Sequence, residues 1–231
     1  MIDGPKYHDI LGVKVASSDK DRVLEILGQV LTKKSIDRPF FVVTANPEIV
    51  MLAQDDPGYK EILRSADLVF ADGSGLRWAG VTDVVPGRRI VEELCKKHDY
   101  RLFFLGGLNG VTRLMAQKYG GKSDPGERNI RVQERNAEII KRINEYNPDV
   151  LFVAYGAPWQ ERWIYENLSR LKCKVVMGVG GSFDYLTGKA KLPPVWLEKL
   201  GLEWLWRLVH EPSRWRRQLN LVRFAWKLLQ T

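Results

Sequence analysis

Residues 39–48 read Pro39-Phe-Phe-Val-Val-Thr-Ala-Asn-Pro-Glu48, and this stretch predicts a complete strand-to-helix unit. The short apolar run from Phe40 to Thr44 is typical of a strand buried on both faces of a parallel sheet. Asn46 supplies a helix cap, and Pro47 suits the first helical position because its missing N–H would be unsatisfied there in any case. A strand that leads directly into a capped helix favours an α/β fold.

The same unit recurs on both sides of this stretch. Strands are expected at residues 10–16, 67–71, 101–105, 149–155 and 174–178, each but the last followed directly by a helix, and residues 120–129 are expected to form a polar loop. This alternation predicts a Rossmann-like, mainly parallel sheet with helices on both faces. After Gly188 the pattern changes, and from Pro193 on successive helices follow without a returning strand. We therefore expect an α/β domain at residues 1–192 and a helical appendage at residues 193–231.

Composition separates the same two regions. The 231-residue chain has a formal net charge of +8, which favours an anionic partner such as a nucleotide, a nucleic acid or an anionic membrane. Between Arg207 and Thr231 lie six basic residues and one acidic residue, and five of the eight tryptophans follow residue 195. The appendage is therefore basic and rich in tryptophan, whereas the body is close to neutral.

The sequence gives little support for a disulfide-rich, metal-binding, secreted or membrane-spanning protein. Two cysteines, Cys95 and Cys173, are too few for a disulfide framework and are expected to be buried thiols in a reducing compartment. The three histidines are isolated, and Asp19-Lys-Asp21 starts a helix, so we expect no metal site and no cofactor. The first residues resemble no secretion signal, and no apolar run approaches the ~18–20 residues that span a bilayer. We expect a protein that is soluble or lies on a surface.

Ligands of open parallel sheets bind outside the carboxyl ends of the strands, so each strand end is a candidate site. The strand ends predicted here are rich in glycine, which lets a backbone approach a ligand closely, and neither a dinucleotide nor a P-loop motif is present. The candidates are Thr44 and Asn46, Asp72 and Gly73, Gly106 and Gly107, Gly156 to Gln160 with Pro158, and Gly178 to Gly181 with Gly180.

Asp72 is the carboxylate with the strongest claim to chemistry. It follows a predicted strand and precedes Gly73 and Gly75, so it can serve as a general base if it reaches the proton it must take. An Asx-turn or a helix cap explains the same residue equally well. Gln160 and Glu161 stand one turn into a helix, where they can contact a ligand, or where Glu161 merely favours the helix N-terminus.

The last predicted helix carries an apolar stripe made of Trp215, Leu219, Val222, Trp226 and Leu229. Basic residues lie on another side of the same helix. A basic amphipathic helix with tryptophan is typical of a membrane interface. Packing of the stripe against the body or another subunit explains the spacing equally well.

Taken together, the motifs resemble the WecG/TagA/CpsF glycosyltransferases, also called glycosyltransferase family 26. The resemblance covers nearly the whole chain and rests on an ordered series of short motifs. They are Thr44-Ala-Asn-Pro-Glu48, Ala71-Asp-Gly-Ser-Gly75, Gly106-Gly107, Gly156-Ala-Pro-Trp-Gln-Glu161, Gly178-Val-Gly-Gly-Ser-Phe-Asp-Tyr-Leu-Thr-Gly188, Gly201 to Leu208, and Glu211-Pro212.

The resemblance implies an inverting enzyme that moves N-acetylmannosamine from UDP-ManNAc to polyprenyl-diphosphate-linked GlcNAc in a β-1,4 linkage, without a metal. In wall teichoic acid synthesis this step builds the linkage unit. Relatives that use N-acetylmannosaminuronic acid or glucose serve common antigen or exopolysaccharide instead. The implied partners are a UDP-sugar, an undecaprenyl-diphosphate-linked acceptor and the inner face of the cytoplasmic membrane, on which the protein would be peripheral.

The resemblance also assigns residues. It implies that Asp72 is the base with Thr44 as its partner, and that the Gln160 amide and the C-terminal arginines Arg214, Arg217 and Arg223 serve the reaction. We expect further substrate-binding residues at the strand ends and motifs quoted above: Asn46, Gly73, Gly106, Gly107, Gly156, Pro158, Glu161, Gly180, Gly181 and Asp184. The chain departs from the family pattern after Pro86-Gly87, where Arg88-Arg89 replace an acidic residue, at Trp159, and at Leu192-Pro-Pro194.

Two hypotheses of another class use only the basic tail. A nucleic-acid-binding module would bind in a strongly salt-sensitive way and would not need glycine-rich strand ends in the body. A non-enzymatic membrane adaptor would bind no UDP-sugar. An unburied apolar stripe would also be adhesive in water, so we expect the soluble protein to self-associate as a homo-oligomer.

Overall fold

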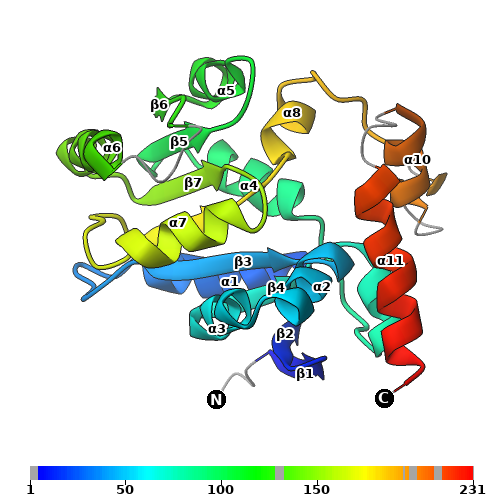
Figure 1. Cartoon of the computed structure of the whole chain (residues 1–231). Coiled ribbons are helices and arrows are strands. Elements are labelled where there is room, and N and C mark those ends of the chain that lie inside the picture. Colours follow the sequence, from blue (N-terminus) through cyan, green and yellow to red (C-terminus); the bar gives the residue numbers. More distant parts are fainter. Residues whose placement is uncertain (1–4, 128–132, 195, 198–201, 211–214, 231) are drawn as a thin grey trace.

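A computed structural model of the chain describes residues 5–127, 133–194, 196–197, 202–210 and 215–230. Its centre is an eight-stranded sheet in the order β1-β2-β4-β3-β8-β7-β5-β6, parallel except for the β1/β2 pair (Figure 1). The strands are β1 (Lys6–Ile10), β2 (Val13–Ser17), β3 (Phe40–Ala45), β4 (Leu68–Ala71), β5 (Leu102–Gly106), β6 (Lys122–Asp124), β7 (Val150–Ala154) and β8 (Val175–Gly178). The predicted fold class is confirmed.

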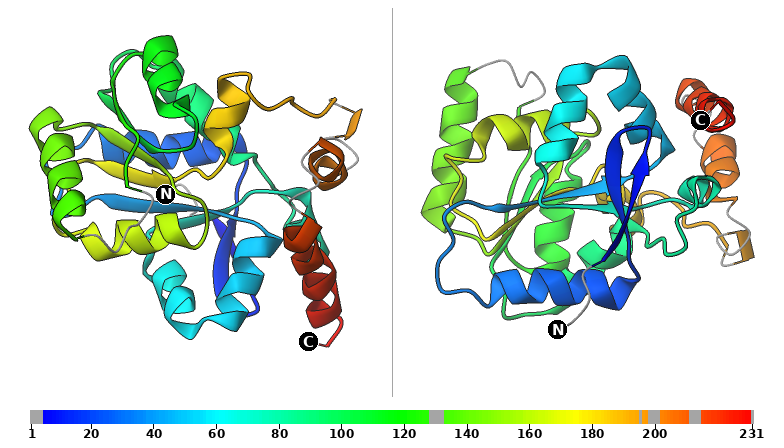
Figure 2. Two further views of the ribbon diagram at one scale, coloured as in Figure 1. Left: turned by 45° about the horizontal axis from the view of Figure 1, so that its top comes forward. Right: turned by 90° about the horizontal axis from the view of Figure 1, so that it is seen from below.

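Helices cover both faces of this sheet, and Figure 2 shows the sheet between the two helix layers. One layer holds α2 (Pro47–Asp55), α3 (Pro57–Ser65), α6 (Gln133–Tyr146) and α7 (Trp159–Asn167); the other holds α1 (Lys20–Leu31), α4 (Gly87–Lys96), α5 (Val111–Tyr119) and α8 (Ser182–Leu186). Alternate residues of each strand serve the two layers: in β3, Phe41 and Val43 face the first and Val42 the second. A strand buried on both faces needs an unbroken apolar run, as residues 40–43 provide.

The caps read from the sequence are present. The Asp19 side chain accepts a hydrogen bond from the Arg22 amide at 2.8 Å, and the Asn46 side chain accepts one from the Ile49 amide at 3.0 Å. These bonds satisfy amide groups that have no partner within the first helical turn. Local sequence therefore fixes where both helices begin, and Asn46 fixes the point at which β3 leaves the sheet.

The expected strand at residues 10–16 is instead the second half of a hairpin. Leu11 and Gly12 both have positive φ, 53° and 81°, and turn the chain between β1 and β2. The Gly12 amide donates to the Asp9 carboxylate at 2.7 Å across this turn. β1 is mostly exposed, so its side chains lack the apolar run that marks a buried strand.

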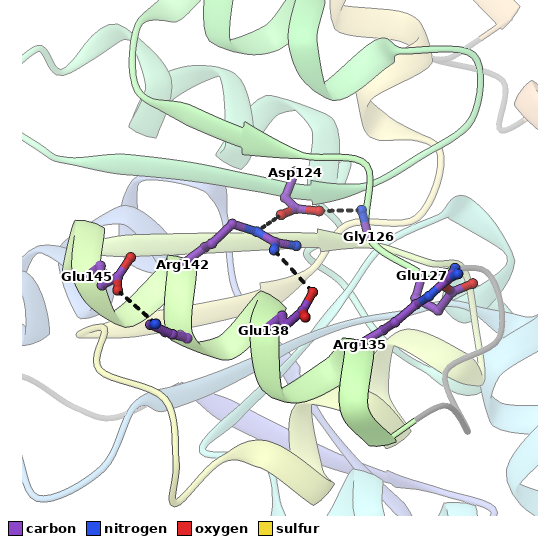
Figure 3. Close-up of polar contacts among 8 residues, drawn as sticks. Asp124, Gly126, Glu127, Arg135, Glu138, Arg142 and Glu145 are labelled. Carbon is purple, nitrogen blue, oxygen red and sulfur yellow. Dashed lines mark hydrogen bonds and ion pairs between the residues drawn. The ribbon is translucent and has the colours of Figure 1, made fainter.

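The expected loop at residues 120–129 contains the edge strand β6. This strand has only three residues, Lys-Ser-Asp, and no apolar pattern, so its pairing with β5 was not predictable from local sequence. Asp124 is buried, and its carboxylate is satisfied there: it accepts from the Arg142 guanidinium on α6 at 2.7 Å and from the Gly126 amide at 2.8 Å (Figure 3). A long-range ion pair thus holds the strand in place.

The C-terminal segment contributes helices α10 (Glu203–His210) and α11 (Trp215–Leu228). They lie beside the end of the molecule toward which β3 and β7 point (Figure 1). α11 contacts α2 and the short 3-10 helix η1 (Ser74–Ala79), with Phe224 completely buried. The Arg223 guanidinium also binds the Asp55 carboxylate of α2 with two hydrogen bonds of 2.8 and 2.9 Å. Helix α11 is therefore packed on α2 and η1.

Candidate active site at the carboxyl ends of the strands

Asp72 and Thr44 meet at the start of α4. Thr44 is buried at the end of β3, where its hydroxyl donates to the Gly178 carbonyl at 3.4 Å, and the Asp72 amide donates to the Ala45 carbonyl at 2.6 Å. A Cβ atom added to Gly87 would lie 2.8 Å from Thr44 Cγ2 and 3.2 Å from Asp72 Oδ2. The carboxylate therefore lies against the first residue of α4, at the positive end of a helix dipole.

These side chains line a small cavity of about 100 Å³. Asn46 and Glu48 line it from the start of α2, and Arg88 from the start of α4. Arg88 is the cation among the described residues that line this cavity. The arrangement places the carboxylates of Asp72 and Glu48, a hydroxyl and a guanidinium around a space too small for a whole nucleotide.

A larger cavity of about 840 Å³ lies at the ends of β5, β7 and β8. This volume is within the usual range of small-molecule sites. Its polar lining includes Asp184 with Lys189 and Lys191, and its wall includes Trp206 and His210 of α10, whose rings stand 4.0 Å apart. Sequence reasoning missed both lysines and this aromatic pair. The four-residue spacing of Trp206 and His210, which places both on one helix face, was the available signal.

Glycines make the larger cavity possible. At Gly107, φ is 73° and a Cβ atom would lie 2.4 Å from Val111 Cγ2, so no other residue fits without movement. Gly156 and Gly180 also have positive φ, and both line the two cavities together with Gly181 and Tyr185. The two cavities thus share four residues and form neighbouring parts of one site.

Gln160 and Glu161 are almost completely buried, at 2% and 0% exposed, although Gln160 borders the smaller cavity. Gln160 Oε1 accepts from the amides of Gly180 and Gly156, while its Nε2 donates to Glu161. Burial raises the pKa of Glu161, against the opposing effect of hydrogen bonds from Gln160 and from the Tyr59 hydroxyl. Both side chains therefore take part in an internal network.

The other expected residues lie at varied distances from the cavities. Gly106 packs against the Tyr155 ring, Gly73 lies beside Asn46, and Pro158 precedes α7 after a cis peptide bond; none of the three lines either cavity. Arg223 is bound to Asp55 and lines neither cavity. Arg214 and the side chain of Arg217 lie outside the described residues.

The apolar stripe of α11 is exposed as far as its side chains are described. Leu219, Val222, Trp226 and Leu229 are between 50% and 84% exposed, while Phe224 on the opposite face is buried against the body. Trp78 of the neighbouring η1 is also 58% exposed. Within the described residues, no helix combines the length and the apolar character needed to cross a bilayer.

The cysteines behave as the sequence predicts. Cys95 and Cys173 are buried free thiols, and burial raises the pKa of both, that of Cys95 to about 12. The described part of the chain contains no cluster of three or more His, Cys, Asp or Glu side chains in reach of one metal ion.

Comparison with known proteins identifies the family. The model of the glycosyl transferase WecG/TagA/CpsF family matches residues 8–231. An N-acetylglucosaminyldiphosphoundecaprenol N-acetyl-beta-D-mannosaminyltransferase of Bacillus subtilis (strain 168) is 32% identical over 215 residues, covering 87% of this chain and 84% of the relative. The protein of the same name from Staphylococcus aureus (strain MRSA252) is 30% identical over 233 residues, covering 95% and 91%.

The chain therefore belongs to the WecG/TagA/CpsF glycosyl transferase family. The resemblance read from the motifs is confirmed, and the protein is a glycosyltransferase and not a module without enzymatic activity.

Proposed function

We propose that this member of the WecG/TagA/CpsF family transfers N-acetylmannosamine from UDP-ManNAc to GlcNAc carried on undecaprenyl diphosphate, forming a β-1,4 linkage. The step serves synthesis of the wall teichoic acid linkage unit. Support comes from the two relatives named above, which carry this activity in their names and align over most of both chains. The observation that carries the chemistry is the pairing of Asp72 and Thr44 in a small cavity that borders a nucleotide-sized one.

The two cavities suggest where each part of the reactants binds. UDP occupies the larger cavity, where the glycine-rich ends of β5, β7 and β8 allow close approach and Lys189 and Lys191 face the diphosphate. The donor sugar extends past Gly156 and Gly180 into the smaller cavity. This orientation brings the anomeric carbon toward Asp72.

Asp72 acts as the general base of a single displacement. It removes the proton from the acceptor hydroxyl as the oxygen attacks the anomeric carbon, and the bond between that carbon and the diphosphate oxygen breaks on the opposite side. UDP leaves with the bonding electrons, so the configuration inverts. Thr44 orients the Asp72 carboxylate or the incoming hydroxyl.

The departing diphosphate needs positive charge around it. Arg88, Lys189 and Lys191 are the arginine and lysine side chains among the described residues that line the two cavities. We propose Arg214 and Arg217 as the cations that the C-terminal segment supplies to the diphosphate. Arg223 holds the appendage on α2 through Asp55, and it reaches the diphosphate only if that ion pair opens.

The enzyme works as a peripheral protein on the inner face of the cytoplasmic membrane. The exposed row from Leu219 to Leu229, with Trp78 beside it, offers apolar side chains to the interface where a lipid-linked acceptor resides. Lys227 follows Trp226 in the same helix and favours an anionic surface. The basic appendage thus serves a membrane and a diphosphate.

The test is UDP release from a panel of UDP-sugars, with and without the lipid-diphosphate-GlcNAc acceptor, followed by mass analysis of the lipid product. Release with UDP-ManNAc that depends on the acceptor is the expected result. If only UDP-linked N-acetylmannosaminuronic acid or UDP-glucose supports transfer, the proposed sugar is wrong. If no UDP-sugar supports acceptor-dependent release, the proposed reaction is wrong.

A further inference from the structure

The amide group of Gln160 ties together two loops that come from different strands. Its Oε1 accepts from the Gly156 amide, just after β7, at 3.2 Å and from the Gly180 amide, just after β8, at 2.9 Å. A Cβ atom added to Gly178 would lie 2.9 Å from Gln160 Nε2, so the side chain also packs directly against the end of β8. One carbonyl oxygen thereby fixes the separation of the two loops.

Hydrogen bonds on both sides of this amide determine its orientation. Gln160 Nε2 donates to Glu161 Oε1 at 2.7 Å, and the Tyr59 hydroxyl of α3 donates to Glu161 Oε2 at 3.1 Å. A backbone amide can only donate, so the amides of Gly156 and Gly180 need an acceptor. A flipped Gln160 would set its NH₂ group against both of these N–H groups. The two glycine amides therefore permit one orientation, and Glu161, held by Tyr59, accepts from the Nε2 that this orientation turns toward it.

The part of this network behind Gln160 lies outside the two cavities described above. Tyr59 and Glu161 are fully buried, and neither lines the larger or the smaller cavity. Gly156 and Gly180, by contrast, line both the larger cavity and the cavity of Asp72. Any movement of these two loops changes the path from the nucleotide to the carboxylate.

We infer that Gln160 is a positioning residue, oriented by Glu161 and Tyr59, which sets the placement of the donor relative to Asp72 by clamping Gly156 to Gly180. This inference rests on the proposed function for its effect on turnover. Misplacing a reacting group by about 1 Å costs on the order of 10²-fold in rate, so loosening the clamp lowers kcat strongly. UDP keeps the contacts that it makes with Gly107, Lys189 and Lys191 of the larger cavity, so its Kd changes less than kcat.

An exchange of the two side chains separates positioning from substrate contact. Gln160→Glu alone places two carboxylates against each other, so kcat is expected to fall about 10²-fold, the cost of a misplaced reacting group. In the double variant Gln160→Glu with Glu161→Gln, the new carboxylate accepts from both glycines and from the new amide, whose oxygen accepts from Tyr59. We expect the double variant to recover most of the lost kcat. A double variant as slow as Gln160→Glu would mean that substrate needs the Gln160 amide itself and would overturn the inference.

Tyr59→Phe tests the same network from a residue that cannot touch substrate. The change removes one hydroxyl from a buried ring, so the fold is retained. The expected result is a lower kcat, a nearly unchanged Kd for UDP, and faster hydrogen exchange at the Gly156 and Gly180 amides. Tyr146→Phe is the matched control, because Tyr146, the last residue of α6, packs against Phe103 of β5 and lines neither cavity.

Hydrogen exchange distinguishes failure of the inference from failure of the proposed function. If the unaltered enzyme transfers no sugar, the proposed reaction fails, yet the exchange of the two glycine amides still reports on the clamp. Equal exchange rates at Gly156 and Gly180 in Tyr59→Phe and Tyr146→Phe would refute the clamp. Unchanged kcat in Tyr59→Phe, in an enzyme that does transfer sugar, would refute its role in turnover.

Discussion

Gly87→Ala is the sharpest test of the site geometry, because it adds one methyl group at the point where Asp72 and Thr44 meet. The φ angle of Gly87 is not in the left-handed region, so alanine is compatible with the backbone there. The new Cβ would lie 2.8 Å from Thr44 Cγ2. Two non-bonded carbons rest about 3.5–4.0 Å apart, so Thr44 or the start of α4 must move by roughly 0.7–1.2 Å.

A displacement of this size next to Asp72 should slow the reaction. Misplacing a reacting group by about 1 Å costs on the order of 10²-fold in rate, so kcat should fall by about that factor. Gly87 does not line the larger cavity, and therefore the Kd for UDP should stay close to that of the unaltered enzyme. Overpacking typically costs about 1–3 kcal/mol of stability.

The assay is single-turnover transfer together with UDP titration and thermal unfolding. Gly28→Ala is the matched control, since its Cβ meets nothing within 4 Å in the middle of α1. Alanine in a helix interior is favoured over glycine by roughly 1 kcal/mol, so this control should be slightly more stable and fully active. Turnover of Gly87→Ala at the rate of the control would refute the assignment of Asp72 and Thr44 to the reacting centre.

Four further predictions test other parts of the molecule. Asp72→Asn should lower kcat by ~10²–10⁴-fold with an unchanged unfolding temperature, the range typical of a lost general base, and near-normal turnover would exclude it as the base. Trp226→Ala should weaken binding to anionic phospholipid vesicles about tenfold or more, because burying a large apolar side chain contributes roughly 1.5–3 kcal/mol. The same variant should self-associate less in sedimentation, and unchanged vesicle binding would contradict a membrane role. Phe224→Ala should cost roughly 3–5 kcal/mol of packing between α11 and the body and expose the appendage to limited proteolysis, whereas resistance equal to that of the unaltered protein would show that other contacts suffice. Cys95 and Cys173 should not react with a thiol reagent at pH 8, because burial keeps both thiols protonated well above that pH, with the pKa of Cys95 at about 12, and should react fully in denaturant; fast reaction of either native thiol would contradict their burial.

The position of Arg88 connects a departure from the family pattern to the site. The residues after Pro86-Gly87 differ from the usual motif, and Arg88 lines the cavity that holds Asp72. A cation at the start of α4 is placed to act on the diphosphate or on an anionic group of the sugar.

Much of the fold was predictable because its signals are local. The apolar run of β3 and the caps at Asp19 and Asn46 depend on residues within a few positions of one another. Such patterns indicate which backbone groups are satisfied and which faces are buried, even when the elements that pack against them are not known. The strand ends could be chosen as sites for the same reason, since parallel strands deliver all their carboxyl ends to one edge.

The hairpin and the edge strand β6 were not predictable from such signals. β6 has no apolar pattern, and only its pairing with β5 and the ion pair from Asp124 to Arg142 on α6 give it a defined place. The exposure of the α11 stripe was also not predictable, because the spacing of apolar residues along a helix is the same whether the stripe faces solvent or protein. Burial of Phe224 against the body resolves that choice for the described side chains.

By itself the sequence determined the α/β fold, the glycine-rich strand ends, Asp72 as the candidate base and the family. Only the tertiary structure decided how those residues lie together. Asp72 lies against Gly87, and Gln160 donates to Glu161, which also binds Tyr59, 102 residues away in the chain. The physical reason is that propensities and caps act between near neighbours in the chain. A clamp between two loops depends on distances between side chains that only the packed sheet and its helices establish.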